Sequence, residues 1–380
     1  MKFQASIFSE MTGLALHYGA INLAQGFPEF GPPEGAVEAY HQALADGRNQ
    51  YAPMAGWPAL REALSQVDQR RWGATHSAVA HPDTEITIVP GATVGLYAVF
   101  LALLEPGDEA VVLEPAYDSY VPALHRAGAN VVGTSFEAPD WDRVLGPKTR
   151  LIVINSPHNP TGGVWERADW NRLAESLEQY PRVVVVSDEA YEWMVFDGRP
   201  PLSVRQIDAL RPRSVRILSL GKTFHATGWK IGAVIAPAEL TDAIRQVYQF
   251  LAFSANTPAQ LALASYLHTH PEYPETLAAF FQSKRDRLAH GLEAGGWRVK
   301  PCAGSYFLTL ALENLGPEES DREWAKARVR DAGVATVPLA PFFEHIPQPF
   351  PAVRLCFAKH DATLDRAIDL LNSWKFTHNA

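Results

Sequence analysis

The chain has 380 residues, of which 47% are hydrophobic and 20% charged, values that suit a soluble globular protein with a large core and two domains. Its formal net charge of −9 argues against a general binder of nucleic acids or of membrane surfaces. With two cysteines, one chain can build neither a disulfide framework nor a thiolate metal cluster, and the 13 histidines lack metal-site spacing, so we expect no metal.

The N-terminus predicts neither export nor membrane insertion. Its first residues, MKFQASIFSEM, lack the sustained apolar core of a signal peptide, and no apolar run in the chain reaches the length of a membrane span. We therefore expect a cytoplasmic protein that binds neither nucleic acid nor membranes.

Residues 1–35 are expected to form an arm. A helix is predicted at 9–18 and a short strand at 21–24, followed by GFPEFGPP, whose prolines and glycines disfavour regular structure. Such a loop is either a plain connector or a segment that closes over a site.

The middle of the chain alternates strands with helices. Helices at 34–45 and 58–71 flank a turn-rich loop at 49–56, and alternation begins at residue 85. Alternating strands and helices predict α/β units around a mainly parallel sheet, which binds ligands at the carboxyl ends of its strands. No GxGxxG motif follows the first strand, which argues against a dinucleotide-binding domain. The expected strands are 85–89, 110–113, 130–134, 150–155, 182–187, 216–219 and 231–235, with helices at 94–104, 120–127 and in several other gaps.

After about residue 271 the pattern changes to separate helix and strand runs, which predict a small α+β domain. Its expected helices are 277–294, 322–331 and 364–374, and its expected strands are 297–299, 305–310, 335–337 and 353–357.

The stretch 216–237, RILSLGKTFHATGWKIGAVIAP, places Lys222 in a small polar loop between two apolar runs. Burial at such a strand end would disfavour the ammonium form and make the amine nucleophilic, as a Schiff-base lysine requires. The alternative is that Lys222 and Lys230 are surface lysines on a loop. The letters GKT also end a phosphate-binding loop, but Arg216 stands where the first glycine of that loop belongs, which argues against a nucleoside triphosphatase.

Polar clusters follow three of the expected strands. NSPHNPTG begins at Asn155, DEAY begins at Asp188, and Lys222 follows the third strand. Because the carboxyl ends of parallel strands meet at one edge of a sheet, we expect these clusters to converge on one crevice. Each cluster also has a plainer interpretation, since NPTG is a turn sequence and an aspartate after a strand is often a helix N-cap.

The string SLGKTFHATGWKIG resembles the active-site lysine segment of the pyridoxal-phosphate aminotransferases of fold type I, in particular the kynurenine / glutamine-phenylpyruvate / methionine aminotransferase subgroup. NLAQGFPEF, NPTG and RLCFAK match the same subgroup, and the resemblance runs from Asn22 to about Leu370. It implies an α/β large domain with a mainly parallel sheet at 36–271, a smaller α+β domain at 272–380, and an arm at 1–35 that packs with the small domain. It also implies pyridoxal 5′-phosphate as the cofactor.

The resemblance implies a set of cofactor contacts. Lys222 would form the Schiff base, Asp188 would keep the ring nitrogen protonated, and Tyr191 and Asn159 would hydrogen-bond the phenolic oxygen. Tyr117 would stack on the ring, although alone it is more typical of a core residue.

The cofactor phosphate would be held by the amides of Ala92 and Thr93 at a helix N-terminus, by Ser219 and Lys230, and by Tyr51 of the neighbouring subunit of a homodimer.

Lys230 departs from many relatives, which carry arginine at this position. A lysine keeps the charge but lacks the two-pronged geometry of a guanidinium. The departure therefore concerns the geometry of phosphate binding rather than the identity of the cofactor.

The resemblance also implies the substrate contacts. Arg354 would clamp the α-carboxylate with help from Asn159, the alternative being a structural ion pair. Gly26 and Phe27 in the arm would cover the substrate. No second arginine stands in a motif that would bind a side-chain carboxylate. The aromatic candidates for the rest of the pocket are Phe27, Phe253, Phe342 and Phe343.

The predicted function is an aminotransferase in which Lys222 acts as general base and acid while a ping-pong cycle moves an amino group from an L-amino acid to a 2-oxo acid. An apolar pocket favours donors of the methionine, phenylalanine, glutamine or kynurenine type and disfavours aspartate. A pyridoxal-phosphate β-lyase for cysteine conjugates would use the same residues and stays open as the alternative. A cofactor-binding regulator lacks support because no DNA-binding segment is recognised.

Overall fold

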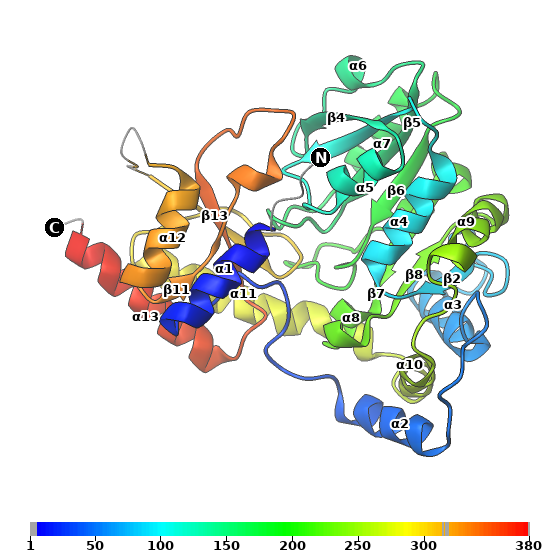
Figure 1. Ribbon diagram of the computed structural model, residues 1–380, viewed down its shortest axis with the longest axis horizontal. Coiled ribbons are helices and arrows are strands. Elements are labelled where there is room, and N and C mark those ends of the chain that lie inside the picture. The colour runs from blue at the N-terminus through cyan, green and yellow to red at the C-terminus, as the bar shows by residue number, and fades with distance from the viewer. Residues whose placement is uncertain (1–5, 314, 316–318, 379–380) are drawn as a thin grey trace.

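The described residues form three sheets, and the largest has seven strands in the order β2-β8-β7-β6-β5-β3-β4 (Figure 1). The computed structural model describes residues 6–313, 315 and 319–378, so residues 1–5 of the expected arm lie outside the described part. Strand β8 runs antiparallel to β2 and β7, and the remaining pairs are parallel, which confirms the predicted mainly parallel sheet. The strands are β2 (Ile86–Val89), β3 (Glu109–Glu114), β4 (Asn130–Ser135), β5 (Thr149–Asn155), β6 (Val184–Asp188), β7 (Ser214–Ser219) and β8 (Gly232–Ile235).

Both faces of this sheet are buried. Successive residues of a strand point to opposite faces, and accordingly Ile152 and Val185 belong to one apolar cluster while Val153 and Val186 belong to another. Burial on both sides explains why these strands are almost continuous apolar runs in the sequence. The helices in this part of the chain are α2 (Glu34–Ala45), α3 (Pro58–Trp72), α4 (Ala92–Leu103), α5 (Tyr120–Arg126), α6 (Trp141–Val144), α7 (Arg167–Ser176), α8 (Leu220–Thr223), α9 (Ala238–Leu251) and α10 (Thr257–Thr269).

The second sheet has four antiparallel strands in the order β12-β13-β10-β9. They are β9 (Arg298–Val299), β10 (Phe307–Ala311), β12 (Val337–Pro338) and β13 (Ala352–Cys356), and they lie with α11 (Leu277–Ala294), α12 (Asp321–Asp331) and α13 (Asp361–His378) on the left of Figure 1.

The N-terminal segment joins this smaller sheet region. Helix α1 (Ile7–Tyr18) begins after Ser6, whose side chain caps it by accepting a hydrogen bond from the Ser9 amide. Glu10 of α1 forms an ion pair with Arg322 of α12 at 2.6 Å. Strand β1 (Ile21–Asn22) then pairs in parallel with β11 (Val334–Ala335), after which the chain crosses to α2 (Figure 1).

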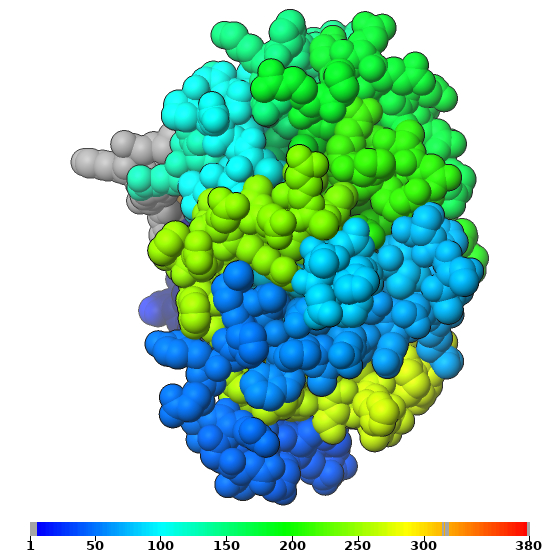
Figure 2. Space-filling model, turned by 90° about the vertical axis from the view of Figure 1, so that its right-hand side faces the viewer, coloured from blue at the N-terminus to red at the C-terminus, as the bar shows by residue number. Residues whose placement is uncertain are grey.

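Segments far apart in the sequence meet on the face shown in Figure 2, where the blue region of α2 and α3 lies against the yellow-green region of α9 and α10. The amide of Trp57 donates to Oε1 of Gln260 at 2.7 Å, and the Thr257 hydroxyl donates to the Gln50 carbonyl at 2.6 Å. Helix α10 therefore anchors the loop that carries Tyr51.

The predicted elements agree with the observed ones to within a few residues, and the helices at 34–45 and 277–294 have the predicted bounds. The loop predicted around Lys222 is wrong in one respect, because the lysine lies in the short helix α8. Leu220 and Phe224 are both buried, and their spacing of four residues suits a helical turn with one apolar face. The strand predicted at 335–337 is split, because β11 pairs with β1 whereas β12 pairs with β13.

Two negative findings apply to the part of the chain that the structure describes. None of its helices is long and apolar enough to cross a membrane. No three of its histidine, cysteine, aspartate or glutamate side chains are grouped so that they could hold a metal ion. The cytoplasmic location stays a prediction.

Candidate active site

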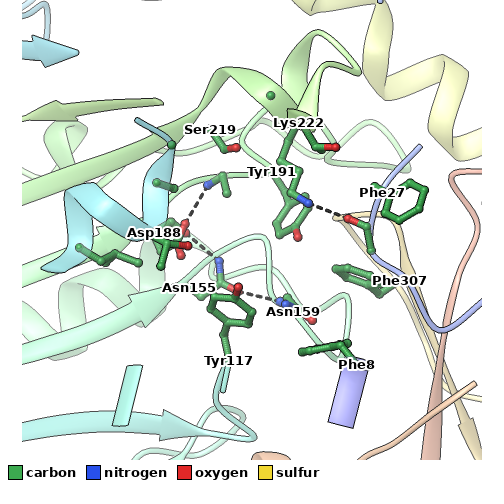
Figure 3. A pocket seen from close by; sticks show the side chains of 18 of the residues that line it. Phe8, Phe27, Tyr117, Asn155, Asn159, Asp188, Tyr191, Ser219, Lys222 and Phe307 are labelled. Carbon is green, nitrogen blue, oxygen red and sulfur yellow. Dashed lines mark hydrogen bonds between the residues drawn. The ribbon is translucent and has the colours of Figure 1, made fainter. Parts of the chain in front are cut away.

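A cavity of about 320 Å³ lies at the ends of β5, β6 and β7, with Asn155, Asp188 and Ser219 on its wall (Figure 3). Phe307 of β10 and Arg354 of β13 line it from the smaller sheet. The three strand-end clusters that were expected to converge do lie around it. The predicted site residues on its wall are Gly26, Phe27, Ala92, Thr93, Tyr117, Asn159, Asp188, Tyr191, Ser219, Lys222, Lys230 and Arg354.

Lys222 projects into the cavity from α8, which begins directly after β7. Its side chain is otherwise surrounded by protein, and burial lowers the pKa of the amine to about 8. Nζ donates a hydrogen bond of 2.6 Å to the carbonyl oxygen of Gly26 in the arm. A substantial fraction of the amine is therefore neutral near pH 8, as a nucleophile or proton acceptor needs to be.

Asp188 ends β6 and is buried. Its carboxylate accepts hydrogen bonds from the Tyr120 hydroxyl at 2.7 Å and from the Ala190 amide at 3.1 Å. Burial raises the pKa of Asp188, although both hydrogen bonds oppose that shift. Because both hydrogen-bond donors are neutral, a cationic group placed against this carboxylate would be favoured.

Asn155, the last residue of β5, connects two of the clusters. Its side-chain nitrogen donates to the Asp188 carbonyl at 2.8 Å, and its side-chain oxygen accepts from the Asn159 amide at 2.7 Å. It thereby fixes the loop that presents Asn159 to the cavity.

Arg354 is 1% exposed in the middle of β13. Nη1 donates to Oδ1 of Asn159 at 2.8 Å and Nη2 to the Ala24 carbonyl at 2.6 Å, while Nε has no partner among the residues that the structure describes. The guanidinium carbon lies 4.0 Å from the ring centre of Phe307 and 4.8 Å from that of Phe8. Burial lowers the pKa of Arg354, and no carboxylate of the described residues forms an ion pair with it. A buried guanidinium of this kind is a binding place for a carboxylate.

The N-terminus of α4 forms a second anion-binding place. Gly91 is the N-cap residue, and none of the described side chains caps the helix, which leaves the amides of its first turn available. A Cβ added at Gly91 would lie 3.2 Å from Nζ of Lys230, so the lysine amine sits close beside this helix start. Within the described ranges, Lys230 takes part in no ion pair. Ser219 completes this corner of the cavity.

Two tyrosines form part of the wall between these groups. Burial raises the pKa of Tyr117 to about 12, with a smaller contribution from the charge of Asp118, and burial likewise raises the pKa of Tyr191. Both phenols therefore stay protonated at neutral pH and can donate hydrogen bonds.

Four predicted residues do not reach the cavity of this single chain. Tyr51 is 82% exposed, and its ring meets that of Phe253 edge-on with centres 5.5 Å apart. Phe342 is buried behind Phe8, with ring centres 5.9 Å apart. Phe343 lines a separate cavity of about 450 Å³ between the two sheets.

Several residues of the site were not predicted from the sequence. Asn155 begins the NSPHNPTG cluster and is the last residue of β5, and this position could have identified it as a site residue. Tyr120 lies three residues after the predicted Tyr117 and was not itself predicted. Phe8 and Phe307 stand in no motif that was assigned to the site, and only the packing of α1 and β10 brings them to the cavity.

The donor set fits pyridoxal phosphate. The cavity offers a helix N-terminus with a nearby lysine for a phosphate, a buried carboxylate that favours a cationic ring nitrogen, and an amine for a carbonyl carbon. Tyr117 adds an aromatic surface, and Asn159 and Tyr191 add polar groups. Arg354 of β13 adds a buried guanidinium to the same wall.

Comparisons with known proteins agree with this geometry. The family model for aminotransferase class I and II matches residues 18–371. The chain is 41% identical to methionine aminotransferase of Escherichia coli K12, covering 96% of this chain and 95% of the relative. It is 31% identical to kynurenine–oxoglutarate transaminase 1 of Rattus norvegicus, covering 97% and 96%. The structure of N-succinyldiaminopimelate aminotransferase from Mycobacterium tuberculosis superposes with a TM-score of 0.91 at 37% identity, covering 98% of each chain. The chain therefore belongs to the class I and II aminotransferases.

Proposed function

We propose that this aminotransferase binds pyridoxal 5′-phosphate and takes its amino group from an apolar, aromatic or sulfur-containing L-amino acid. The substrate class is inferred from the apolar surroundings of Arg354, whose guanidinium faces the rings of Phe8 and Phe307. The only other cations on the cavity wall of the described chain are Lys222 and Lys230. No further cation is available there for a side-chain carboxylate. The 41% identity to a methionine aminotransferase supports the same class.

We propose a role for each polar group toward the cofactor. Lys230, Ser219 and the amides of Ala92 and Thr93 hold its phosphate, and Asp188 faces its ring nitrogen. When bound, the cofactor supplies an electron sink for the pair left on the substrate α-carbon. Further contacts to its ring come from Tyr117, Asn159 and Tyr191.

Lys222 performs the proton transfers in this proposal. Its amine would take a proton from the substrate α-carbon, becoming an ammonium, and would then deliver that proton to the former carbonyl carbon of the cofactor, so that the amino group stays with the cofactor. A pKa near 8 suits a group that has to exist in both forms. Arg354 and Asn159 orient the substrate by its α-carboxylate, so that the α-proton faces Lys222.

Selectivity among amino acids tests the substrate class. With a fixed 2-oxo acid, kcat/KM for methionine and phenylalanine should exceed that for aspartate by about 10- to 150-fold, which corresponds to burying one large apolar side chain. Steady-state kinetics across the twenty amino acids would measure this, with norleucine as a control that keeps the length of methionine without sulfur. Aspartate as the best donor would contradict an apolar pocket.

Elimination is the alternative outcome at the same site. A cysteine conjugate carries a leaving group on the β-carbon, so the electron pair on the α-carbon could expel it instead of being reprotonated. Pyruvate and ammonia release should be assayed beside transamination on the same protein. Dominant release would assign the chain to cysteine-conjugate β-lyase activity.

We further propose a homodimer in which Tyr51 reaches the cofactor phosphate of the neighbouring subunit. The exposure of Tyr51 and Phe253 on one surface supports this proposal. We also propose residues 1–35, 36–271 and 272–380 as arm, large domain and small domain.

Mixing two inactive variants tests the shared site. At limiting cofactor, Tyr51→Phe and Lys222→Ala should each be weakly active or inactive. In a refolded equal mixture, about a quarter of all sites should be complete, because half of the dimers are hybrids and one of the two sites in each hybrid is complete. Activity would be measured against unmixed controls at the same total concentration. A fully active monomer in analytical ultracentrifugation would contradict the shared site.

A further inference from the structure

The carbonyl oxygen of Gly26 accepts two hydrogen bonds inside the site. One comes from Nζ of Lys222 at 2.6 Å and the other from the hydroxyl of Tyr306 at 2.5 Å. A carbonyl oxygen has two lone pairs, so both are used. The amine on α8 and the phenol next to β10 thus meet at one atom of the N-terminal arm.

Tyr306 lies behind the cavity wall rather than on it. Its side chain is 0% exposed, and the wall at this point is formed by its neighbours Phe307 and Tyr191. Its ring packs edge-on against Tyr191 with centres 5.0 Å apart, and Nζ of Lys222 lies 5.4 Å from its ring centre. Tyr306 therefore contacts two proposed site residues without lining the cavity.

The arm is tightly fitted around Gly26. A Cβ added at Gly26 would lie 2.9 Å from Cζ of Phe307, closer than real contacts allow. The carbonyl of Ala24 accepts from Arg354 at 2.6 Å, and that of Phe27 accepts from Lys359 at 3.3 Å. Residues on either side of Gly26 are thus held by the smaller sheet region, and Tyr306 is the group from that region that holds the Gly26 carbonyl itself.

We propose that Tyr306 is a positioning residue that holds the Gly26 carbonyl against the Lys222 amine, so that the arm controls where the amine sits and how readily it carries a proton. The inference rests on the role of Lys222 in the proposed function. The carbonyl is the acceptor within reach of the amine whenever the amine is not bonded to another group. A purely structural Tyr306 would stabilise the fold without affecting the amine.

The charge of the protonated amine determines in which direction the pKa of Lys222 should change when Tyr306 is replaced. A hydrogen bond to an ammonium is stronger than one to a neutral amine, so a well-placed carbonyl favours the protonated form of Lys222. Removing the phenol lets the carbonyl move away, and the pKa of Lys222 should then fall. Losing the second donor also makes the carbonyl a better acceptor, because two donors on one oxygen compete for its electron density, and this would raise the pKa of Lys222. A fall in the pKa of Lys222 would therefore show that the Gly26 carbonyl is no longer held in place. A rise would show that the phenol and the amine had competed for that carbonyl.

The other groups that face Lys222 stay in place in this comparison. Burial is the main cause of its lowered pKa, Arg354 and Lys230 lower it further, and Cys356 and Asp188 raise it. The Tyr306 phenol does not itself titrate near neutral pH, because burial together with Tyr191 raises its pKa well above the usual value.

The test measures Lys222 in the cofactor-free full-length protein. The protein is labelled with acetic anhydride over a pH series, and mass spectrometry quantifies the label on the peptide that contains Lys222. The midpoint of this curve is the pH at which half of the Lys222 amine is neutral. The parent should titrate near 8, and Tyr306→Phe should titrate lower by about half a unit or more. In the loaded enzyme, kcat should fall about 5- to 20-fold with a smaller change in KM.

Tyr248→Phe is the matched control. Tyr248 is also 0% exposed, and its hydroxyl has no hydrogen-bond partner among the described residues, so this variant loses a buried phenol away from Lys222. Its labelling midpoint and kcat should equal those of the parent. If Tyr306→Phe does not accumulate, Gly26→Ala tests the same contact from the arm, because the added Cβ would displace the carbonyl and lower the midpoint in the same direction.

An unchanged or raised midpoint in Tyr306→Phe would overturn the inference, as would an equal fall in Tyr248→Phe. Labelling requires neither cofactor nor turnover. A protein that fails to transaminate would therefore contradict the proposed function and leave the labelling result to decide on Tyr306.

Discussion

Replacing Lys222 with alanine is expected to reduce kcat for transamination by at least about 10³-fold, because the amine is both the covalent nucleophile and the proton carrier. Among the described residues, the only other amine on the cavity wall is that of Lys230, which lies beside the start of α4. The remaining cation, Arg354 of β13, is a guanidinium that stays protonated. Single-turnover kinetics with methionine would measure the chemical step directly.

Cofactor affinity separates lost chemistry from lost binding. Lys222→Ala should still bind pyridoxal phosphate in equilibrium dialysis, because the N-terminus of α4, Lys230 and Asp188 remain. Lys230→Ala is the control with the opposite outcome, since it should weaken cofactor binding about tenfold or more and keep most of kcat at saturating cofactor. Near-normal transamination by Lys222→Ala would show that the central assignment is wrong.

The large sheet could be predicted from the sequence because its strands are buried on both faces. Runs such as that of β6 are apolar at every position except the last two, and those last positions carry Ser187 and Asp188. The same rule placed the cluster that begins at Asn155, and also Lys222, near the ends of β5 and β7, although it gave Asn155 itself no role. Strand ends that carry polar residues thus revealed both the fold and the crevice.

Residues that reach the site through tertiary packing could not be predicted in this way. Phe8 reaches the cavity because α1 packs against α12, and Tyr306 reaches Lys222 because the arm turns its Gly26 carbonyl between them. Neither contact leaves a local pattern in the sequence. The short helix α8 was also missed, because four residues are too few for a periodic signal.

A buried ionic network supports the segment that carries Asp188 and Tyr191. Arg216 of β7 is 1% exposed, and it donates to Glu189 at 2.9 Å, to Asp68 at 2.8 Å and to Glu192. Arg71 also donates to Glu192, at 2.7 Å. Glu189 and Glu192 each directly follow one of the two site residues, so the network fixes the backbone directly after each of them.

Arg216→Met is expected to lower the free energy of unfolding by about 3–5 kcal/mol, because it leaves carboxylates buried without their main partner. Chemical denaturation would measure the change. Arg287→Met is the matched control, since Arg287 is 41% exposed and pairs with Asp365 at 2.8 Å, and exposed pairs contribute about 0–1 kcal/mol. Equal losses in the two variants would contradict a special role for the buried network.

The pH dependence of the loss of unfolding free energy in Arg216→Met gives a second, independent test of the buried network. Burial raises the pKa of Asp68 and of Glu189, and the charge of Arg216 opposes both shifts. Without Arg216 the folded-state pKa values rise further above the unfolded values of about 4, so the folded variant binds protons that the unfolded chain releases. A raised carboxyl pKa contributes stability below the unfolded pKa and loses it as the pH rises through the folded pKa. The deficit of Arg216→Met should therefore be largest at neutral and alkaline pH and shrink toward acid pH. A deficit that is independent of pH would indicate lost packing of the arginine side chain instead of unpaired carboxylates.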